Sequence, residues 1–237
     1  MLKNVTKKGA KNMQKNRFLR TIAVLLLAAI MVTPQSVMAA PKIITCEQGE
    51  VTTINIVHDT LEKTKMDKVP LFNQVDYPNH PYGNYGSIAS HGCGIVSVTM
   101  VLSYLKDTVY SPVDMAKEFG HYNTEHGSYW SLMTDAFVKY GIEAPMQTRS
   151  TKTLVEKLKE GHVAISIQHE GLFTGGGHYI VLAGITEDGK IIVNDPNGGN
   201  WQKNAEMIEG FTNGFTPEQV DASNSLYWIY PLKENNP

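Results

Sequence analysis

The chain has 237 residues, with 21 lysines and arginines against 23 aspartates and glutamates and a formal net charge of −2 at pH 7. Its first 40 residues hold seven of the basic residues and no acidic one, so the remainder carries 14 basic against 23 acidic residues, a formal charge of −9. That charge argues against nucleic acid or anionic lipid as a partner, because both bind basic protein surfaces.

Residues 1–40 have the order of features of a secretory signal peptide. A basic leader precedes an apolar run at Ile22–Val32, then Pro34 and the small residues Ala39-Ala40. The run is shorter than the roughly 20 residues that a membrane span needs. We therefore expect cleavage near Ala40, a secreted mature chain and no stable membrane insertion after cleavage. The alternative is an uncleaved N-terminal anchor.

After the signal peptide, we expect an N-terminal extension at 41–66, with a strand at Val51–Val57, and one domain at 67–237. The two cysteines of the chain are Cys46 and Cys93. A single disulfide between them is one option, although a disulfide framework normally uses more cysteines in a smaller protein. The sequence around Cys93 favours a different use.

The first half of the domain has the pattern of helices. The segment Asn73–Ser90 is rich in Asn, Pro, Gly and Tyr and is expected to be a long loop. Ser111, Pro112 and Asp114 supply an N-cap, a proline at the first helical position and an acidic third residue. Helices are expected at Cys93–Leu105, from Ser111 onward, at Ser128–Tyr140 and at Ser150–Glu160.

The second half has the pattern of strands. Strands are expected at His162–Gln168, Tyr179–Ile185, Lys190–Val193 and Leu226–Leu232. The tripeptide Glu187-Asp188-Gly189 predicts a hairpin between the second and third of these. Because helices come first and strands second, the sequence predicts an α+β fold with an antiparallel sheet and not a doubly wound parallel one.

The sequence Ser90-His91-Gly92-Cys93-Gly94 leads directly into an apolar helix. A cysteine in the first turn of a helix lies at the positive end of the backbone dipoles, which favours the thiolate and lowers the thiol pKa. The flanking glycines keep side chains from crowding the sulfur. Cys93 is therefore a candidate nucleophile, and the alternative is a buried structural cysteine.

A glycine run, Gly175-Gly176-Gly177, places His178 at the entry to a strand, and Asp195 closes the partner strand. The two positions are nearly symmetric about the predicted turn, so they should lie opposite each other or one diagonal apart. A carboxylate there can bind one imidazole nitrogen and direct the other at the thiol. The alternative is a structural histidine and an Asp-Pro turn.

The remaining histidines indicate no metal site. They share no consistent ligand spacing, and His91 is too close to Cys93 along the chain to face it. The sequence therefore predicts no metal and no cofactor. The other six histidines are His58, His80, His121, His126, His162 and His169.

Several motifs together resemble one family. They are His-Gly-Cys-Gly-Ile-Val-Ser-Val around the cysteine, Gly-His-Tyr-Ile-Val-Leu, Asn-Asp-Pro, and Phe72-Asn73-Gln74 upstream. They resemble the motifs of the bacteriocin-processing, double-glycine-leader cysteine peptidases, and more closely those of standalone secreted relatives without a transporter. The resemblance covers about residues 67–232, in the same order.

The resemblance implies a papain-like fold in which Cys93 is the nucleophile, His178 the base and Asp195 the residue that orients it. It also implies that Gln74 donates to the oxyanion. The transporter-linked members carry their glutamine a few residues before the cysteine, whereas Gln74 stands nineteen before it and Ser87 stands six before it.

From these residues we expect a monomeric cysteine peptidase that hydrolyses a peptide or protein substrate through a thioester. One alternative is a cell-wall amidase or endopeptidase of the NlpC type, and a smaller one is transglutaminase-like acyl transfer. Another is a non-catalytic peptide-binding module on the same fold. The presence of all three triad residues argues against the last.

Overall fold

A computed structural model describes residues 65–198 and 204–234, which belong to the unit Asn55–Pro237. The predicted signal peptide at 1–40, the strand expected at Val51–Val57, Cys46 and nearly all of the extension at 41–66 lie outside the described residues. In the described part of the chain, no helix is long and apolar enough to cross a membrane.

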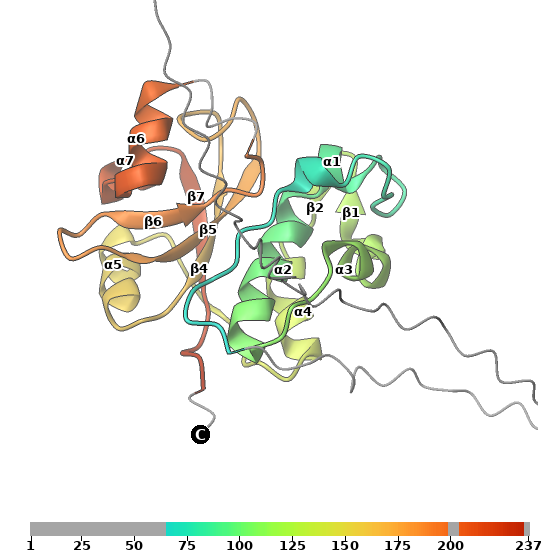
Figure 1. Ribbon diagram of the computed structural model, residues 1–237, viewed down its shortest axis with the longest axis horizontal. Coiled ribbons are helices and arrows are strands. Elements are labelled where there is room, and N and C mark those ends of the chain that lie inside the picture. Colours follow the sequence, from blue (N-terminus) through green and yellow to red (C-terminus); the bar gives the residue numbers. More distant parts are fainter. Residues whose placement is uncertain (1–64, 199–203, 235–237) are drawn as a thin grey trace, which may run out of the picture. The chain divides into compact units, whose positions relative to one another are not determined.

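Helices dominate the first half of the described chain (Figure 1). They are α1 (Ile88–His91), α2 (Cys93–Lys106), α3 (Pro112–Glu118) and α4 (Leu132–Lys139), with short 3-10 helices at Gln74–Asp76 and Gly120–Tyr122 and a two-stranded hairpin of β1 (Asn123–Thr124) and β2 (Gly127–Ser128). The predicted cap of α3 is present, since the Ser111 side chain accepts a hydrogen bond from the Asp114 N–H.

The second half is built on a five-stranded sheet in the order β3-β7-β4-β5-β6. Its strands are β3 (Met146–Thr148), β4 (Ala164–Gln168), β5 (His178–Ile185), β6 (Ile191–Asn194) and β7 (Asn224–Ile229). Every pair of neighbours is antiparallel. The predicted α+β class with an antiparallel sheet is therefore confirmed.

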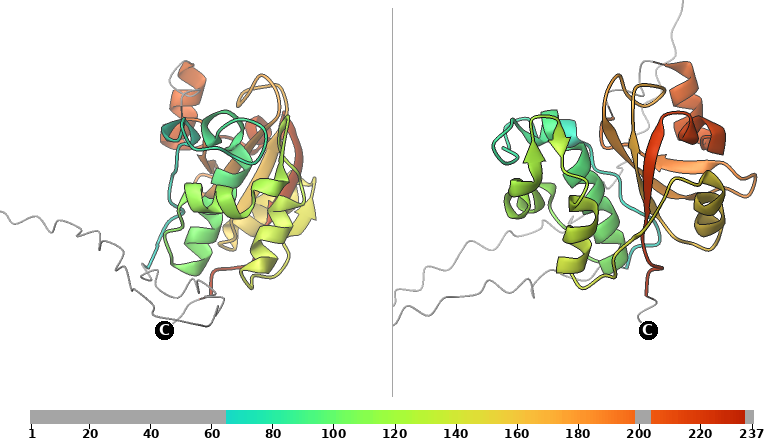
Figure 2. Two further views of the ribbon diagram at one scale, coloured as in Figure 1. Left: turned by 90° about the vertical axis from the view of Figure 1, so that its right-hand side faces the viewer. Right: turned by 180° about the vertical axis from the view of Figure 1, so that it is seen from behind.

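Helices cover both faces of this sheet (Figures 1 and 2). Helix α2 packs on one face, where its buried side chains meet Ile165, Tyr179 and Val181 in one apolar core. The other face is covered by α5 (Thr151–Lys159), α6 (Ala205–Asn213) and α7 (Pro217–Asp221), whose apolar side chains form a second core with residues such as Ile180 and Leu182. Because both faces are covered, β4 is buried at all five positions.

Some predicted boundaries are wrong. The third helix begins at Leu132 and not at Ser128, because Ser128 pairs with Asn123 in the β1–β2 hairpin. The loop predicted at Asn73–Ser90 ends earlier, since α1 begins at Ile88. The last strand, expected at Leu226–Leu232, begins two residues earlier and ends three residues earlier. Helices α6 and α7 follow strands β4 to β6, so the predicted order of helices first and strands second holds only in part.

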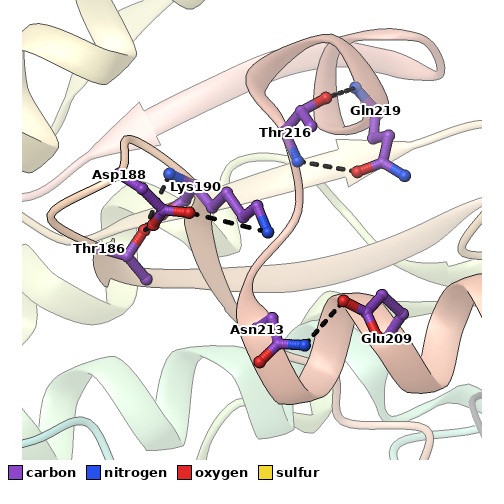
Figure 3. A network of polar contacts seen from close by, with 7 residues as sticks. All are labelled: Thr186, Asp188, Lys190, Glu209, Asn213, Thr216 and Gln219. Carbon is purple, nitrogen blue, oxygen red and sulfur yellow. Dashed lines mark hydrogen bonds and ion pairs between the residues drawn. The ribbon is translucent and has the colours of Figure 1, made fainter.

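Polar contacts fix the turn between β5 and β6 and the neighbouring helix ends (Figure 3). The Thr186 hydroxyl donates to Asp188 at 2.5 Å and accepts from the Lys190 N–H at 2.9 Å. Nearby, Thr216 and Gln219 form a reciprocal capping box at the start of α7. The turn lies where Glu187-Asp188-Gly189 predicted it, and its geometry sets the register of the hairpin that carries the site.

Candidate active site

Cys93 is the first residue of α2, a helix whose positions from Gly94 to Ser103 are all buried. Its own side chain is half-buried and borders a pocket. The N–H groups of the first helical turn have no partner within the helix, and the backbone dipoles place partial positive charge there. The sulfur therefore lies where a negative charge is favoured.

The structure shows a packing reason for the glycine at position 94, which the sequence did not indicate. A Cβ atom at this position would lie 2.6 Å from the Ser128 hydroxyl oxygen, so only glycine lets α2 approach β2 this closely. The Ser128 hydroxyl is hydrogen-bonded to the Tyr82 hydroxyl at 2.9 Å, and the Ser128 carbonyl accepts from the Tyr179 hydroxyl at 3.1 Å. These three residues form a rigid polar support beside the cysteine.

His178 begins β5, and its Nε2 is 2.7 Å from Asp195 Oδ1. Both side chains are buried, and the same carboxylate oxygen accepts the Asn197 N–H at 2.7 Å. Because Nε2 faces the carboxylate, Nδ1 is the nitrogen that remains for the cysteine. The structure thus brings together the histidine and aspartate that the hairpin symmetry predicted.

A β-bulge explains why the two side chains share a face. Gly184 pairs with Ile192, and the next pair away from the turn is Leu182 with Val193. Ala183 therefore has no partner on β6 and is an extra residue on β5. Continued by one residue, this register places Asp195 opposite Ile180, one diagonal from His178. Without the bulge, Asp195 would lie opposite Val181 and face the other side of the sheet.

The His178 side chain and the N–H groups of Tyr179 and Gly94 all act on the Cys93 sulfur and favour its thiolate form. Strand β6 ends at Asn194, opposite Val181, so Tyr179 lies beyond the end of the β5–β6 ladder. The Tyr179 N–H contact was not predicted, since no side-chain pattern marks a backbone donor.

The pKa values of the two groups move in opposite directions. Burial is the largest influence on the Cys93 thiol and raises its pKa, but the hydrogen bond and charge of His178, with the two backbone N–H groups, outweigh it and lower the pKa. Burial lowers the pKa of His178, but the hydrogen bonds and charges of Asp195 and Cys93 outweigh it and raise the pKa. Each group favours the charged form of the other, so the site favours a thiolate–imidazolium pair.

Gln74 is buried and connects the two segments that flank the site. Its side-chain Nε2 donates to the Ala89 carbonyl at 2.8 Å, four residues before Cys93, and its backbone N–H donates to the Pro196 carbonyl at 2.6 Å. A side-chain amide has two N–H groups, so one remains for another acceptor. The structure therefore places Gln74 between the segment before the cysteine and the segment after Asp195.

A pocket of about 880 Å³ opens beside Cys93. Its volume lies within the range of about 300–1,000 Å³ that is usual for ligand sites. The sheet contributes Ile167 and Tyr179 to its lining, the glycine run contributes Gly177, and β2 and the loops around β1, β2 and α4 contribute further residues. In the part of the chain that the structure describes, no group of three or more His, Cys, Asp or Glu residues could hold a metal ion.

A cysteine at the start of a buried helix, with a histidine and an aspartate on an antiparallel sheet packed against it, defines a papain-like cysteine-peptidase type of site. The chain belongs to the Peptidase_C39-like family, whose model matches residues 66–216. Membership of this family supports a cysteine-peptidase type of function.

Other comparisons add little. Among solved structures, the chain is similar to the peptidase domain of Streptococcus ComA, a bi-functional ABC transporter involved in a quorum sensing pathway. The sequence identity is 16%, the TM-score is 0.43, and the match covers 64% of this chain and 99% of that one. A TM-score this low does not establish that the two proteins share a fold. The fold class of this chain rests instead on its own strand order and helix packing. No curated protein matches the chain.

The lowered pKa of Cys93 predicts how its alkylation by iodoacetamide depends on pH in a Cys46→Ala background. An ordinary cysteine loses reactivity as the pH falls through about 8.5, whereas Cys93 should keep it below that value and lose it only at its own lowered pKa. His178→Ala removes the main influence that favours the thiolate while burial remains, so its profile should move above the ordinary value. Mass spectrometry of the labelled protein measures each rate.

Cys93→Ala in the same background should take up no label and serves as the blank. A profile for the parent protein centred at or above about 8.5 would contradict the ion pair.

Proposed function

We propose that the chain is a secreted cysteine peptidase that hydrolyses peptide bonds through a thioester acyl-enzyme. The observation that carries this proposal is the placement of His178 between Asp195, to which it is hydrogen-bonded, and Cys93, whose thiolate it favours. In this proposal Cys93 is the nucleophile, His178 is the general acid and base, and Asp195 orients the imidazole. Family membership supports the reaction class.

The first half of the reaction forms the acyl-enzyme. The Cys93 thiolate attacks the substrate carbonyl carbon, a carbon–sulfur bond forms, and the carbonyl oxygen becomes an oxyanion. The Cys93 N–H and the Gln74 side-chain amide stabilise that charge in this proposal. The His178 imidazolium then gives its proton to the leaving amine as the carbon–nitrogen bond breaks, and a thioester and a neutral imidazole remain.

The second half uses water from the solvent. Neutral His178 takes a proton from the water as its oxygen attacks the thioester carbon. The carbon–sulfur bond breaks, the acid product leaves, and the thiolate–imidazolium pair is restored. Asp195 keeps its hydrogen bond to Nε2 throughout, so Nδ1 faces the reacting atoms in both halves.

The proposed location is outside the cell, after removal of residues 1–40, and the proposed partner is a peptide or protein substrate. The order of the basic leader, the apolar run and the small residues before Pro41 supports this location.

Substitutions in the triad should reduce turnover of a peptide substrate unequally and without additivity. Cys93→Ala should abolish turnover, and His178→Ala should lower kcat by about 10²–10⁴ because it removes general acid–base catalysis. Asp195→Asn should keep the fold and lower kcat by less. Since the three residues act as one unit, the double variant His178→Ala/Asp195→Asn should be no slower than His178→Ala alone. Full activity of Cys93→Ala would overturn the proposal.

Gln74→Ala should lower kcat by roughly 10²–10³ with little change in KM, as expected for the loss of one oxyanion donor. Because Gln74 also holds the Ala89 carbonyl, the alkylation rate of Cys93 should be measured in the same variant. An unchanged alkylation rate with a lowered kcat supports the oxyanion role. A parallel fall in both would assign Gln74 a structural role, and an unchanged kcat would assign the oxyanion to another donor.

Expression with the full leader should yield an exported protein that begins near Ala40 or Pro41. N-terminal sequencing of the extracellular fraction measures this directly. Recovery of the chain with Met1 in a membrane fraction would support the uncleaved anchor instead.

A further inference from the structure

The pocket beside Cys93 has an aromatic wall. Among the described residues, three exposed large apolar side chains are aromatic, namely Tyr85, Tyr129 and Trp130, and all three line this pocket. The other exposed large apolar side chains in that part of the chain are aliphatic, and none lines it. Exposure of aromatic side chains is costly and is concentrated here at one place, which is typical of a binding surface.

The aromatic wall is held in position. The Trp130 ring packs edge-on against the ring of buried Trp228, with 5.8 Å between centroids. The Tyr129 N–H donates to the Tyr122 carbonyl at 3.0 Å. A wall fixed in this way can bind an apolar group with little loss of side-chain entropy.

The pocket is also lined by Gly177, whose identity as glycine the folded chain itself does not require. Gly177 lines the pocket, its φ is not positive, and a Cβ atom added to it would have no other atom within 4 Å. Gly94, by contrast, is enforced by packing against Ser128. Neither the backbone conformation nor the packing therefore requires glycine at position 177, which is next to the candidate catalytic His178. A residue without a side chain there allows the main chain of a ligand to approach closely.

We propose that this pocket binds an extended peptide whose main chain lies against Gly177 and whose large apolar side chain packs against Tyr85, Tyr129 and Trp130. The inference rests on the proposed function, because the peptide is taken to be the substrate. The substrate class is then a peptide with a large apolar residue within two positions of the cleaved bond. A substrate with glycine in place of that apolar residue would leave the aromatic wall uncovered.

The test uses quenched fluorescent peptides that differ only at one of the two positions on either side of the cleaved bond. At the best position, phenylalanine or leucine should raise kcat/KM at least tenfold over glycine. Trp130→Ala should reduce that ratio several-fold, and Tyr129→Ala provides a second variant in case Trp130→Ala does not fold. The matched control is Ile208→Ala, which removes a side chain of similar exposure that does not line the pocket.

Gly177→Ala tests the main-chain contact separately. It should raise KM about tenfold for all peptides, whatever their side chains, and leave the alkylation rate of Cys93 unchanged. The matched control is Gly175→Ala, since that glycine also has a φ that is not positive and open space around an added Cβ but does not line the pocket. Equal effects of the two substitutions would overturn the main-chain contact.

Peptide aldehydes separate failure of this inference from failure of the proposed function. The aldehyde carbon bonds to the Cys93 sulfur and its oxygen takes the imidazolium proton, which gives a hemithioacetal and blocks alkylation. If no peptide is cleaved, the peptidase proposal fails, and the aldehydes still report the preference of the pocket. Protection at lower concentrations by phenylalanine-containing than by glycine-containing aldehydes supports the inference. Equal protection, or equal cleavage of both peptide types with Trp130→Ala unchanged, overturns it.

Discussion

The pairing register of β5 and β6 is the constraint on which the candidate site depends. Side chains alternate between the faces of a strand, so a shift of one residue would move Asp195 to the face opposite His178. The extra residue at Ala183 absorbs that shift between the turn and the site. The polar contacts of Thr186, Asp188 and Lys190 hold the turn from which the register is counted.

The electrostatics of the site depend in turn on that register. Burial opposes the charged forms of both Cys93 and His178, so neither group would ionise readily alone. Asp195 compensates the imidazolium, and the imidazolium compensates the thiolate. The backbone N–H groups of Gly94 and Tyr179 also favour the thiolate, so both charges would be stabilised by groups that the fold has already positioned.

The sequence allowed the features with local signals to be predicted. The start of α2 at Cys93, the cap of α3 at Ser111 and the turn before Lys190 each have a short-range chemical cause, and all three are present. The bulge at Ala183 and the role of Ser128 were missed because each depends on contacts between segments distant in sequence. Helix α6 was also missed, and its Gly210, which packs against Phe215, weakens the helical pattern.

The nitrogen-15 NMR spectrum of the histidines is the test of a His178 imidazolium paired with the Cys93 thiolate. His178→Ala identifies the resonances of His178 in protein labelled at histidine. Both ring nitrogens of His178 should stay protonated at pH 8, well above the ordinary histidine pKa of about 6.5, because Asp195 and Cys93 raise the pKa of His178. A neutral His178 at that pH, with Cys93 still a thiol, would contradict the account.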